Sequence, residues 1–238
     1  MKTRKYKCPM FSLLLAFIIA SAATSAFAQN AGIFGYGIEL LGTGTGALNS
    51  GVTTLYALNN GGTTRLLPLG STATLNQTSW GNGSEASPVL NLGTFVPGAG
   101  DTLTLLGGAM LTFQNGGATV GSNIKLNYRV SPSGGPLSSF PSGLLLGLNE
   151  SNVNGTTGDM RWSDESKSID LLAGLTPGTY ILGSYGLAST SLGTKFANNG
   201  GANYGAYFTV EAVPEPSTLA VAGLGGLAMM ALIRRRKI

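Results

Sequence analysis

The chain has 238 residues, of which 37 are glycine and only 10 % are charged, and it contains no histidine. The missing histidine excludes Ser-His-Asp and Cys-His catalysis and histidine-ligated zinc or copper sites. The formal charge of +4 comes from the two ends, because residues 29–213 hold six cations and nine acids, a net of −3. Such a domain offers no basic face for a phosphate backbone, so no nucleic-acid partner is expected.

The first 28 residues have the layout of a secretory signal peptide. Four cations precede the apolar stretch Phe11–Ala23, and the alanines Ala26 and Ala28 then form an A-x-A cleavage pattern before Gln29. An uncleaved membrane anchor is the alternative, but the stretch is short of the roughly 20 residues that a span needs. We expect export by the secretory translocase and cleavage by signal peptidase between Ala28 and Gln29.

Residues 29–211 predict a single all-β domain. Six stretches alternate or are rich in β-branched and aromatic residues, and turn signals such as Asn115-Gly116-Gly117 separate them. In Ile124–Val130 apolar and polar residues alternate, as a half-buried strand requires. No amphipathic helical window of ten or more residues occurs, so an antiparallel β-sandwich or jelly roll is expected. The predicted strands are Val52–Leu58, Asp101–Leu106, Ile124–Val130, Ser168–Leu172, Thr179–Leu187 and Tyr204–Val210.

Four carboxylates fall within residues 159–170. Paired carboxylates can hydrolyse glycosides, and carboxylate oxygens can bind calcium. The spacing matches no D-x-[DN]-x-[DN]-G loop and two cations interleave, so a solvated loop is the preferred interpretation. Calcium binding by Asp159, Asp164 and Asp170 is a weaker alternative, and catalysis the weakest. No other metal or cofactor is expected.

The aromatic residues raise a further alternative. Trp80, Trp162 and several tyrosines are candidates for a platform on which sugar rings stack, although burial in a core is the simpler interpretation of Trp162. A carbohydrate-binding function therefore stays open.

Residues 212–238 combine three features in order at the C-terminal end. Pro214 and Pro216 flank Glu215 and keep the backbone extended. The 15 uncharged residues Leu219–Ile233 then predict one hydrophobic helix of marginal length for a membrane span. A cationic cluster follows, which would hold that end on the cytoplasmic side and act as a stop-transfer signal. This cluster consists of Arg234, Arg235, Arg236 and Lys237.

These three features together resemble the PEP-CTERM sorting signal of Gram-negative bacteria. The resemblance implies recognition by an exosortase, a membrane cysteine protease-transpeptidase that acts at or near Pro214-Glu215-Pro216. It also implies export across the inner membrane and tethering by the C-terminal helix until processing. The protein would then reach the cell surface or the exopolysaccharide-rich extracellular matrix of a biofilm. A plain tail anchor is the alternative.

The sequence thus predicts three segments: a signal peptide at 1–28, a β-sandwich domain at 29–211 and a sorting signal at 212–238. The leading hypothesis is an exported, non-enzymatic surface or matrix protein, which could contact exopolysaccharide. A carbohydrate-binding module is the alternative, and a carboxylate-dependent polysaccharide hydrolase comes third.

Overall fold

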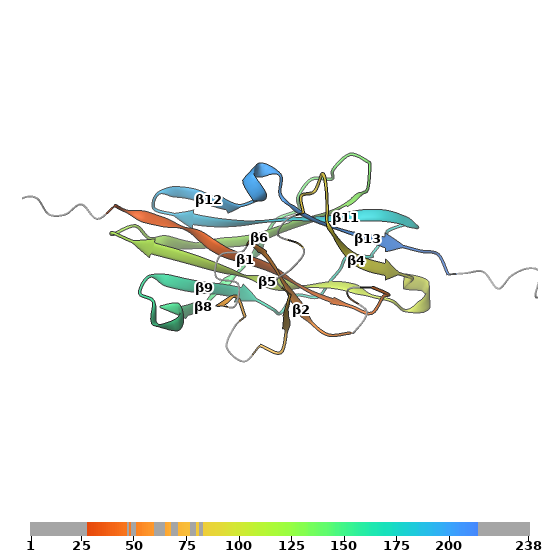
Figure 1. The fold of residues 1–238 in the computed structure, drawn as a ribbon, viewed down its shortest axis with the longest axis horizontal. Coiled ribbons are helices and arrows are strands. Elements are labelled where there is room, and N and C mark those ends of the chain that lie inside the picture. The colour runs from red at the N-terminus through yellow and green to blue at the C-terminus, as the bar shows by residue number, and fades with distance from the viewer. Residues whose placement is uncertain are drawn as a thin grey trace, which may run out of the picture.

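The computed structural model describes residues 28–46, 48, 51–59, 65–67, 71–76, 80 and 83–213. Strands dominate these ranges, and the helical elements with described bounds are three short 3-10 turns (Figure 1). The strands are β1 (Asn30–Gly42), β2 (Thr54–Asn59), β3 (Thr74–Asn76), β4 (Leu90–Phe95), β5 (Leu103–Asn115), β6 (Val120–Pro132), β7 (Leu144–Leu145), β8 (Gly147–Ser151), β9 (Asp159–Asp164), β10 (Ile169–Asp170), β11 (Gly178–Thr190), β12 (Gly193–Ala197) and β13 (Tyr204–Val210). The 3-10 turns are η2 (Pro97–Ala99), η3 (Val153–Gly155) and η4 (Asn199–Gly201).

Two sheets make up the fold. The first has the order β3-β2-β1-β5-β9-β8, with β10 also paired to β5. The second has the order β4-β13-β11-β6-β7, with β12 also paired to β11. The all-β prediction is confirmed, but the expectation of purely antiparallel sheets is wrong, because β2 pairs with β3 and β13 with β4 in parallel. Both parallel pairs have the long connection that parallel strands need, residues 60–73 in the first case and residues 96–203 in the second.

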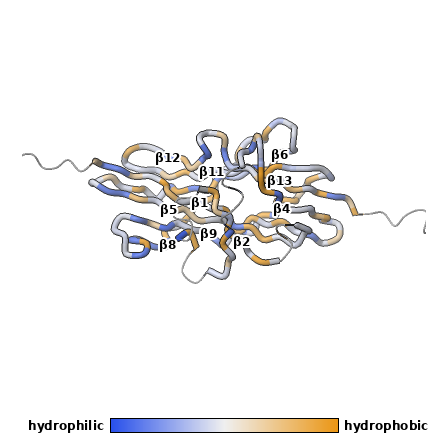
Figure 2. Tube along the Cα trace, viewed as in Figure 1, coloured by the Kyte–Doolittle hydropathy of each residue, from blue (hydrophilic) through white to orange (hydrophobic). Residues whose placement is uncertain are grey.

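The main core lies between the two sheets. Tyr36 and Ile38 of β1 face Leu126 of β6 and Leu182 of β11, and all four side chains are buried. The Tyr36 hydroxyl lies 2.5 Å from Ser184 Oγ, which in turn donates to the Asn127 carbonyl oxygen. This chain of hydrogen bonds satisfies buried hydroxyls while joining one sheet to the other. Figure 2 shows hydrophobic residues along the strands of both sheets.

A second, smaller apolar cluster covers the outer face of the first sheet. Leu55, Ala109 and Leu111 point away from the main core and pack with Leu66 and Val153. The first sheet is therefore buried on both faces around β1 and β5, where the burial pattern is nearly continuous. Strands buried on both faces have apolar runs in place of strict alternation.

One segment closes a side of the sandwich by passing from one sheet to the other. β7 pairs with β6 in the second sheet, and β8, two residues on, pairs with β9 in the first. Leu146 lies at the crossing and is buried, and its N–H donates to the Ile124 carbonyl oxygen at 2.8 Å. Leu145 beside it is exposed.

The described chain enters and leaves at opposite ends of the long axis (Figure 1). Asn30 pairs with Asn115 near the β5–β6 hairpin, whereas Val210 pairs with Gly178 at the other end of β11. Thirteen residues of β11 separate these two levels, which is roughly 40 Å at about 3.3 Å per residue.

Candidate functional site

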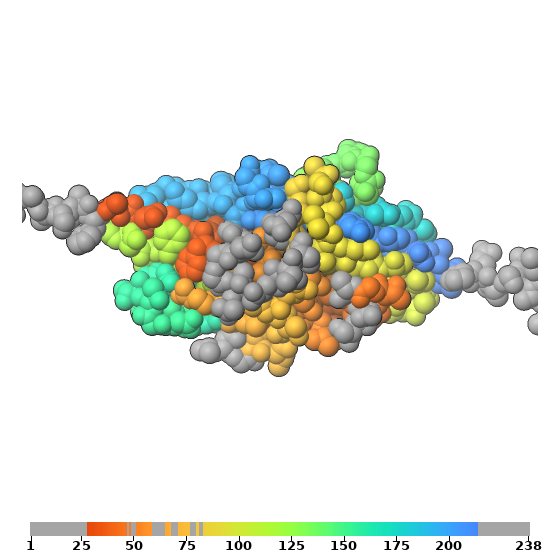
Figure 3. All heavy atoms as spheres, viewed as in Figure 1, coloured from red at the N-terminus to blue at the C-terminus, as the bar shows by residue number. Residues whose placement is uncertain are grey.

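The C-terminal exit of the domain is held in place as far as Val213. After β13 ends at Val210, the Glu211 N–H donates to the Phe95 carbonyl oxygen at 2.9 Å. The Val213 side chain then lies against Gly98 in η2. Figure 3 shows the blue end of the chain beside the yellow-green loop after β4. The predicted processing motif at Pro214, Glu215 and Pro216 thus follows directly on an ordered residue.

The predicted motif itself, the hydrophobic helix and the cluster Arg234–Lys237 lie outside the described residues. Within the described part of the chain, no helix has the length and apolarity needed to cross a membrane.

The predicted signal-peptide cleavage site adjoins the first strand. Ala28 and Gln29 are exposed and come directly before β1, which begins at Asn30. Ala26 and the remainder of the predicted signal peptide lie outside the described residues.

The acidic segment 159–170 is only partly the solvated loop expected, because its first half is strand β9. Asp159 and Asp164 stand at opposite ends of β9, five residues or about 16 Å apart at 3.3 Å per residue. Asp170 lies in β10, and its Oδ1 accepts the Leu172 N–H. The three calcium candidates therefore do not converge, and the described residues contain no cluster of three potential metal-ligating side chains.

Two arginines form ion pairs with carboxylates on β9 and on the neighbouring strand β8. Arg65 Nη2 lies 2.6 Å from Asp159 Oδ2, and Arg161 forms an ion pair with Glu150. Arg161 also donates to the carbonyl oxygens of Arg65 and Leu67, so it pins residues 65–67 onto the outer face of the first sheet. Burial, with a smaller contribution from Arg65, lowers the pKa of the Arg161 guanidinium. Through these arginines, Asp159 and Glu150 help to hold residues 65–67, and with them the second apolar cluster, against the first sheet.

The tryptophans belong to the main core. Trp80 is 1 % exposed and packs edge-on against Tyr56, and Trp162 is 5 % exposed and donates from Nε1 to Thr112 Oγ1 at 2.9 Å. Neither ring is available to a sugar. The outer face of the second sheet instead carries an aromatic cluster of Phe140, Tyr185 and Phe196, of which Phe196 is the most exposed. The rings in this cluster are tilted against one another by 85° and 48°, so they form no flat platform.

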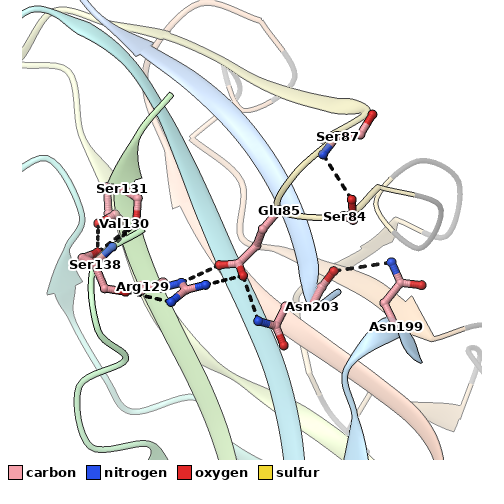
Figure 4. A network of polar contacts seen from close by, with 9 residues as sticks. All are labelled: Ser84, Glu85, Ser87, Arg129, Val130, Ser131, Ser138, Asn199 and Asn203. Carbon is pink, nitrogen blue, oxygen red and sulfur yellow. Dashed lines mark hydrogen bonds and ion pairs between the residues drawn. The ribbon is translucent and has the colours of Figure 1, made fainter. Parts of the chain in front are cut away.

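A buried ion pair lies on the outer face of the second sheet. Glu85 is 3 % exposed, and both of its carboxylate oxygens accept from Arg129, at 2.7 Å from Nε and 2.6 Å from Nη2. Asn203 donates a third hydrogen bond to Glu85 Oε2 at 2.8 Å. Arg129 Nη1 also donates to the Ser138 carbonyl oxygen (Figure 4). The Arg129 guanidinium carbon lies 4.1 Å from the centre of the Phe140 ring. The network ties residues 83–88 and the loop after β6 to the sheet.

Two glycines make room for this carboxylate. Gly183 of β11 and Gly205 of β13 are directly opposite each other in the sheet. A Cβ at position 183 would overlap the Glu85 carboxylate, and a Cβ at position 205 would overlap the backbone of Ser84 and Glu85. The segment therefore lies flat on the sheet only because both positions lack side chains.

A pocket of about 270 Å³ opens beside this network. Its walls combine the apolar side chains of Val130 and Leu175 with the ring of Tyr128 and the polar residues Ser139 and Asp170. Arg129 also lines it, but its guanidinium is already engaged with Glu85 and Ser138.

Glu39 of β1 is a buried carboxylate outside these ion pairs. It is 3 % exposed, and burial together with the negative charge of Glu165 raises its pKa to about 7. Its burial places it out of reach of a polymeric substrate.

Sequence reasoning missed the Glu85–Arg129 pair. The two residues are 44 positions apart, and no local pattern links them. The signal available in the sequence was the scarcity of charge. In a chain with only 10 % charged residues, few charged side chains are expected to lack a structural role.

Comparison with protein families confirms the interpretation of the C-terminal segment. Residues 212–237 match the family model of the PEP-CTERM protein-sorting motif. Comparison with curated proteins and with solved structures gave no match. The match begins at Ala212, two residues after β13 ends, so domain and motif follow one another directly. The chain therefore carries the PEP-CTERM sorting motif, which marks it as an exported protein of the Gram-negative type that is sorted by an exosortase.

Proposed function

We propose that the chain is a non-enzymatic cell-surface or extracellular-matrix protein, and that the exosortase processes it at or near Pro214-Glu215-Pro216. The observation that carries the proposal is the sorting motif, whose match begins at Ala212, two residues after the last strand of a β domain ends at Val210. After processing, the product would be this domain delivered outside the cell, where exopolysaccharide and biofilm matrix are the expected surroundings.

Four carboxylates of the domain support a non-enzymatic role. Glu85, Glu150, Asp159 and Asp164 each form an ion pair with an arginine or lysine. A glycosidase needs two carboxyl groups about 5–10 Å apart that face a substrate. Paired carboxylates that hold loops onto sheets are instead typical of a structural function.

The sorting proposal is tested by replacing Pro214, Glu215 and Pro216 with alanine. We expect the variant to accumulate as unprocessed chain in the membrane fraction. Intact mass of the wild-type protein from the surface or medium should lack residues 1–28 and everything beyond the Pro-Glu-Pro region. Any added mass would identify what the new C-terminus is joined to. Release of the triple variant at the wild-type rate would contradict the proposal.

Carbohydrate binding is the second candidate, and the pocket beside Arg129 favours it. Its mixture of apolar walls, one aromatic ring and the Asp170 carboxylate suits a hydroxyl-rich ring of monosaccharide size. Titration with neutral monosaccharides, followed by NMR, should shift the signals of Tyr128, Val130 and Leu175. Unchanged signals at tens of millimolar sugar would remove this candidate and leave the sorting proposal intact.

A further inference from the structure

The pocket beside Arg129 lies between two segments that are each tied to a strand. On one side, the Ser138 hydroxyl donates to the Val130 carbonyl oxygen of β6 at 2.6 Å (Figure 4). On the other side, the Leu171 N–H donates to the Leu103 carbonyl oxygen of β5 at 2.9 Å. The walls of the pocket are therefore in place before a ligand arrives, which lowers the entropy that binding would cost.

The positive charge at this pocket is already neutralised. Arg129 donates from Nε and Nη2 to the two carboxylate oxygens of Glu85, and from Nη1 to the Ser138 carbonyl oxygen. Glu85 is buried, so drawing the guanidinium away from it would leave a buried carboxylate without its partner, which is strongly unfavourable. An anionic ligand consequently finds no free cation in this pocket.

Asp170 is the other charged residue that lines the pocket. Its Oδ1 accepts the Leu172 N–H at 2.8 Å. Within the part of the chain that the structure describes, Asp170 forms no ion pair, and its Oδ2 accepts no hydrogen bond. Because Arg129 and Glu85 cancel, Asp170 leaves the pocket with one uncompensated negative charge, and this charge favours a cationic ligand.

We infer that the pocket binds an amino sugar with a free, protonated amino group, which donates to the Asp170 carboxylate. The inference rests on the carbohydrate candidate of the proposed function and names its class of sugar. Hydrogen bonds from an ammonium to a carboxylate are stronger than those between neutral groups. The apolar faces of the sugar ring would pack against Val130 and Leu175, and its hydroxyls would meet those of Tyr128 and Ser139.

Three sugars that differ at one ring position test the inference. Glucosamine carries an ammonium there, glucose a hydroxyl and N-acetylglucosamine a neutral acetamide. Each is titrated at pH 6, where the amine of glucosamine is protonated, into the full-length chain in a detergent without a sugar headgroup. Saturation-transfer difference NMR then measures the dissociation constants.

We expect glucosamine to bind about five-fold more tightly than the two neutral sugars at low salt, which is what one exposed ion pair can supply. The preference should shrink as salt is added, because ions screen the attraction. Equal affinity for glucosamine and glucose, or for glucosamine and N-acetylglucosamine, would overturn the inference.

The variant Asp170→Asn removes the charge and keeps an oxygen that can accept the Leu172 N–H. We expect it to bind glucose as the wild type does and to lose the preference for glucosamine. The matched control is Asp101→Asn, because Asp101 also accepts one backbone N–H, from Val96 at 2.8 Å, but lies in the loop after β4. The control should keep the five-fold preference. A preference that survives in Asp170→Asn would contradict the assigned contact.

The remaining outcomes separate the levels of failure. If n-butylamine displaces glucosamine as well as glucosamine itself does, the pocket binds an amine without a sugar ring, as on a lysine of another protein, and the inference is wrong. Binding of all three sugars with equal affinity overturns the inference and leaves the carbohydrate candidate intact. Binding of none removes both. The sorting proposal is tested separately by the alanine variant of Pro214, Glu215 and Pro216.

Discussion

Gly183 shows how a single missing side chain shapes the second sheet. Its position on β11 is filled by the carboxylate of Glu85, which comes from another part of the chain. We predict that Gly183→Ala lowers the free energy of unfolding by about 3 kcal/mol, because the methyl group displaces a buried, paired carboxylate. Urea denaturation measures the change.

Gly147→Ala is the matched control, since Gly147 also lies in a strand and a Cβ there would meet its nearest atom at an ordinary 3.8 Å. We expect a change within about 0.5 kcal/mol, as for exposed positions without special features. Equal effects of the two substitutions would show that Gly183 serves no packing purpose.

Glu39 should make stability depend on pH. Its pKa is raised to about 7 in the folded protein, against an ordinary value of 4.5 in the unfolded chain. Between these values the folded state holds the proton and the unfolded state releases it, so stability falls as pH rises from about 4.5 to about 7. At about 1.4 kcal/mol per pKa unit, the loss is on the order of 3 kcal/mol.

Glu39→Gln removes this titration, so the variant should lose that part of the pH dependence and be more stable than wild type above pH 7. Thermal unfolding from pH 4 to pH 8 is the measurement. Parallel stability curves for the variant and the wild type would be incompatible with a raised pKa.

Single residues were predictable where local pattern decides their environment. In β6 the alternation correctly placed Ile124 and Leu126 in the core. The partners of Glu85 and Asp159 could not be predicted, because each pairs with an arginine more than 40 residues away. Ion pairs of this kind are set by tertiary packing and leave no periodic trace in the sequence.

At the level of elements, prediction succeeded where the sequence alternates or is rich in β-branched and aromatic residues. Tyr204–Val210 was predicted with the bounds of β13, and Ile124–Val130 lies within β6. β1 was missed, and β5 was predicted only at its start, because apolar residues and glycines follow one another in these strands without a clear alternation. β9 was missed because its acidic ends resembled a loop, although arginine and lysine neutralise them.

The segment that joins the two sheets allows a comparison between neighbouring leucines. Leu146 is 1 % exposed and Leu145 is 56 % exposed. We predict that Leu146→Ala lowers the free energy of unfolding by about 2–4 kcal/mol, through lost apolar burial and the cavity that remains. Leu145→Ala should change it by less than about 0.5 kcal/mol. A similar loss for both, measured by urea unfolding, would mean that the crossing is not held by Leu146.

For the whole molecule, we expect the cationic cluster Arg234–Lys237 to determine where the precursor stays before processing. We predict that deleting Arg234–Lys237 reduces the membrane-bound precursor several-fold, because positive charge holds that end on the cytoplasmic side. Replacing Arg234, Arg235 and Arg236 with lysine keeps the charge and should keep the precursor in place. Cell fractionation reports both, and wild-type retention of the deleted chain would contradict a stop-transfer role.

Because the described chain enters and leaves at opposite ends of the domain, the processed protein has a defined orientation relative to its attachment point. Whatever the new C-terminus is joined to, β1 begins about one strand length of β11, roughly 40 Å, away from it. In a molecule fixed through its C-terminal end, Gln29 and the β5–β6 and β11–β12 hairpins therefore lie at the end of the domain that is farthest from the attachment point. An epitope placed directly after Gln29 would stand clear of the attachment point, which makes this end the natural position for a label or a displayed peptide.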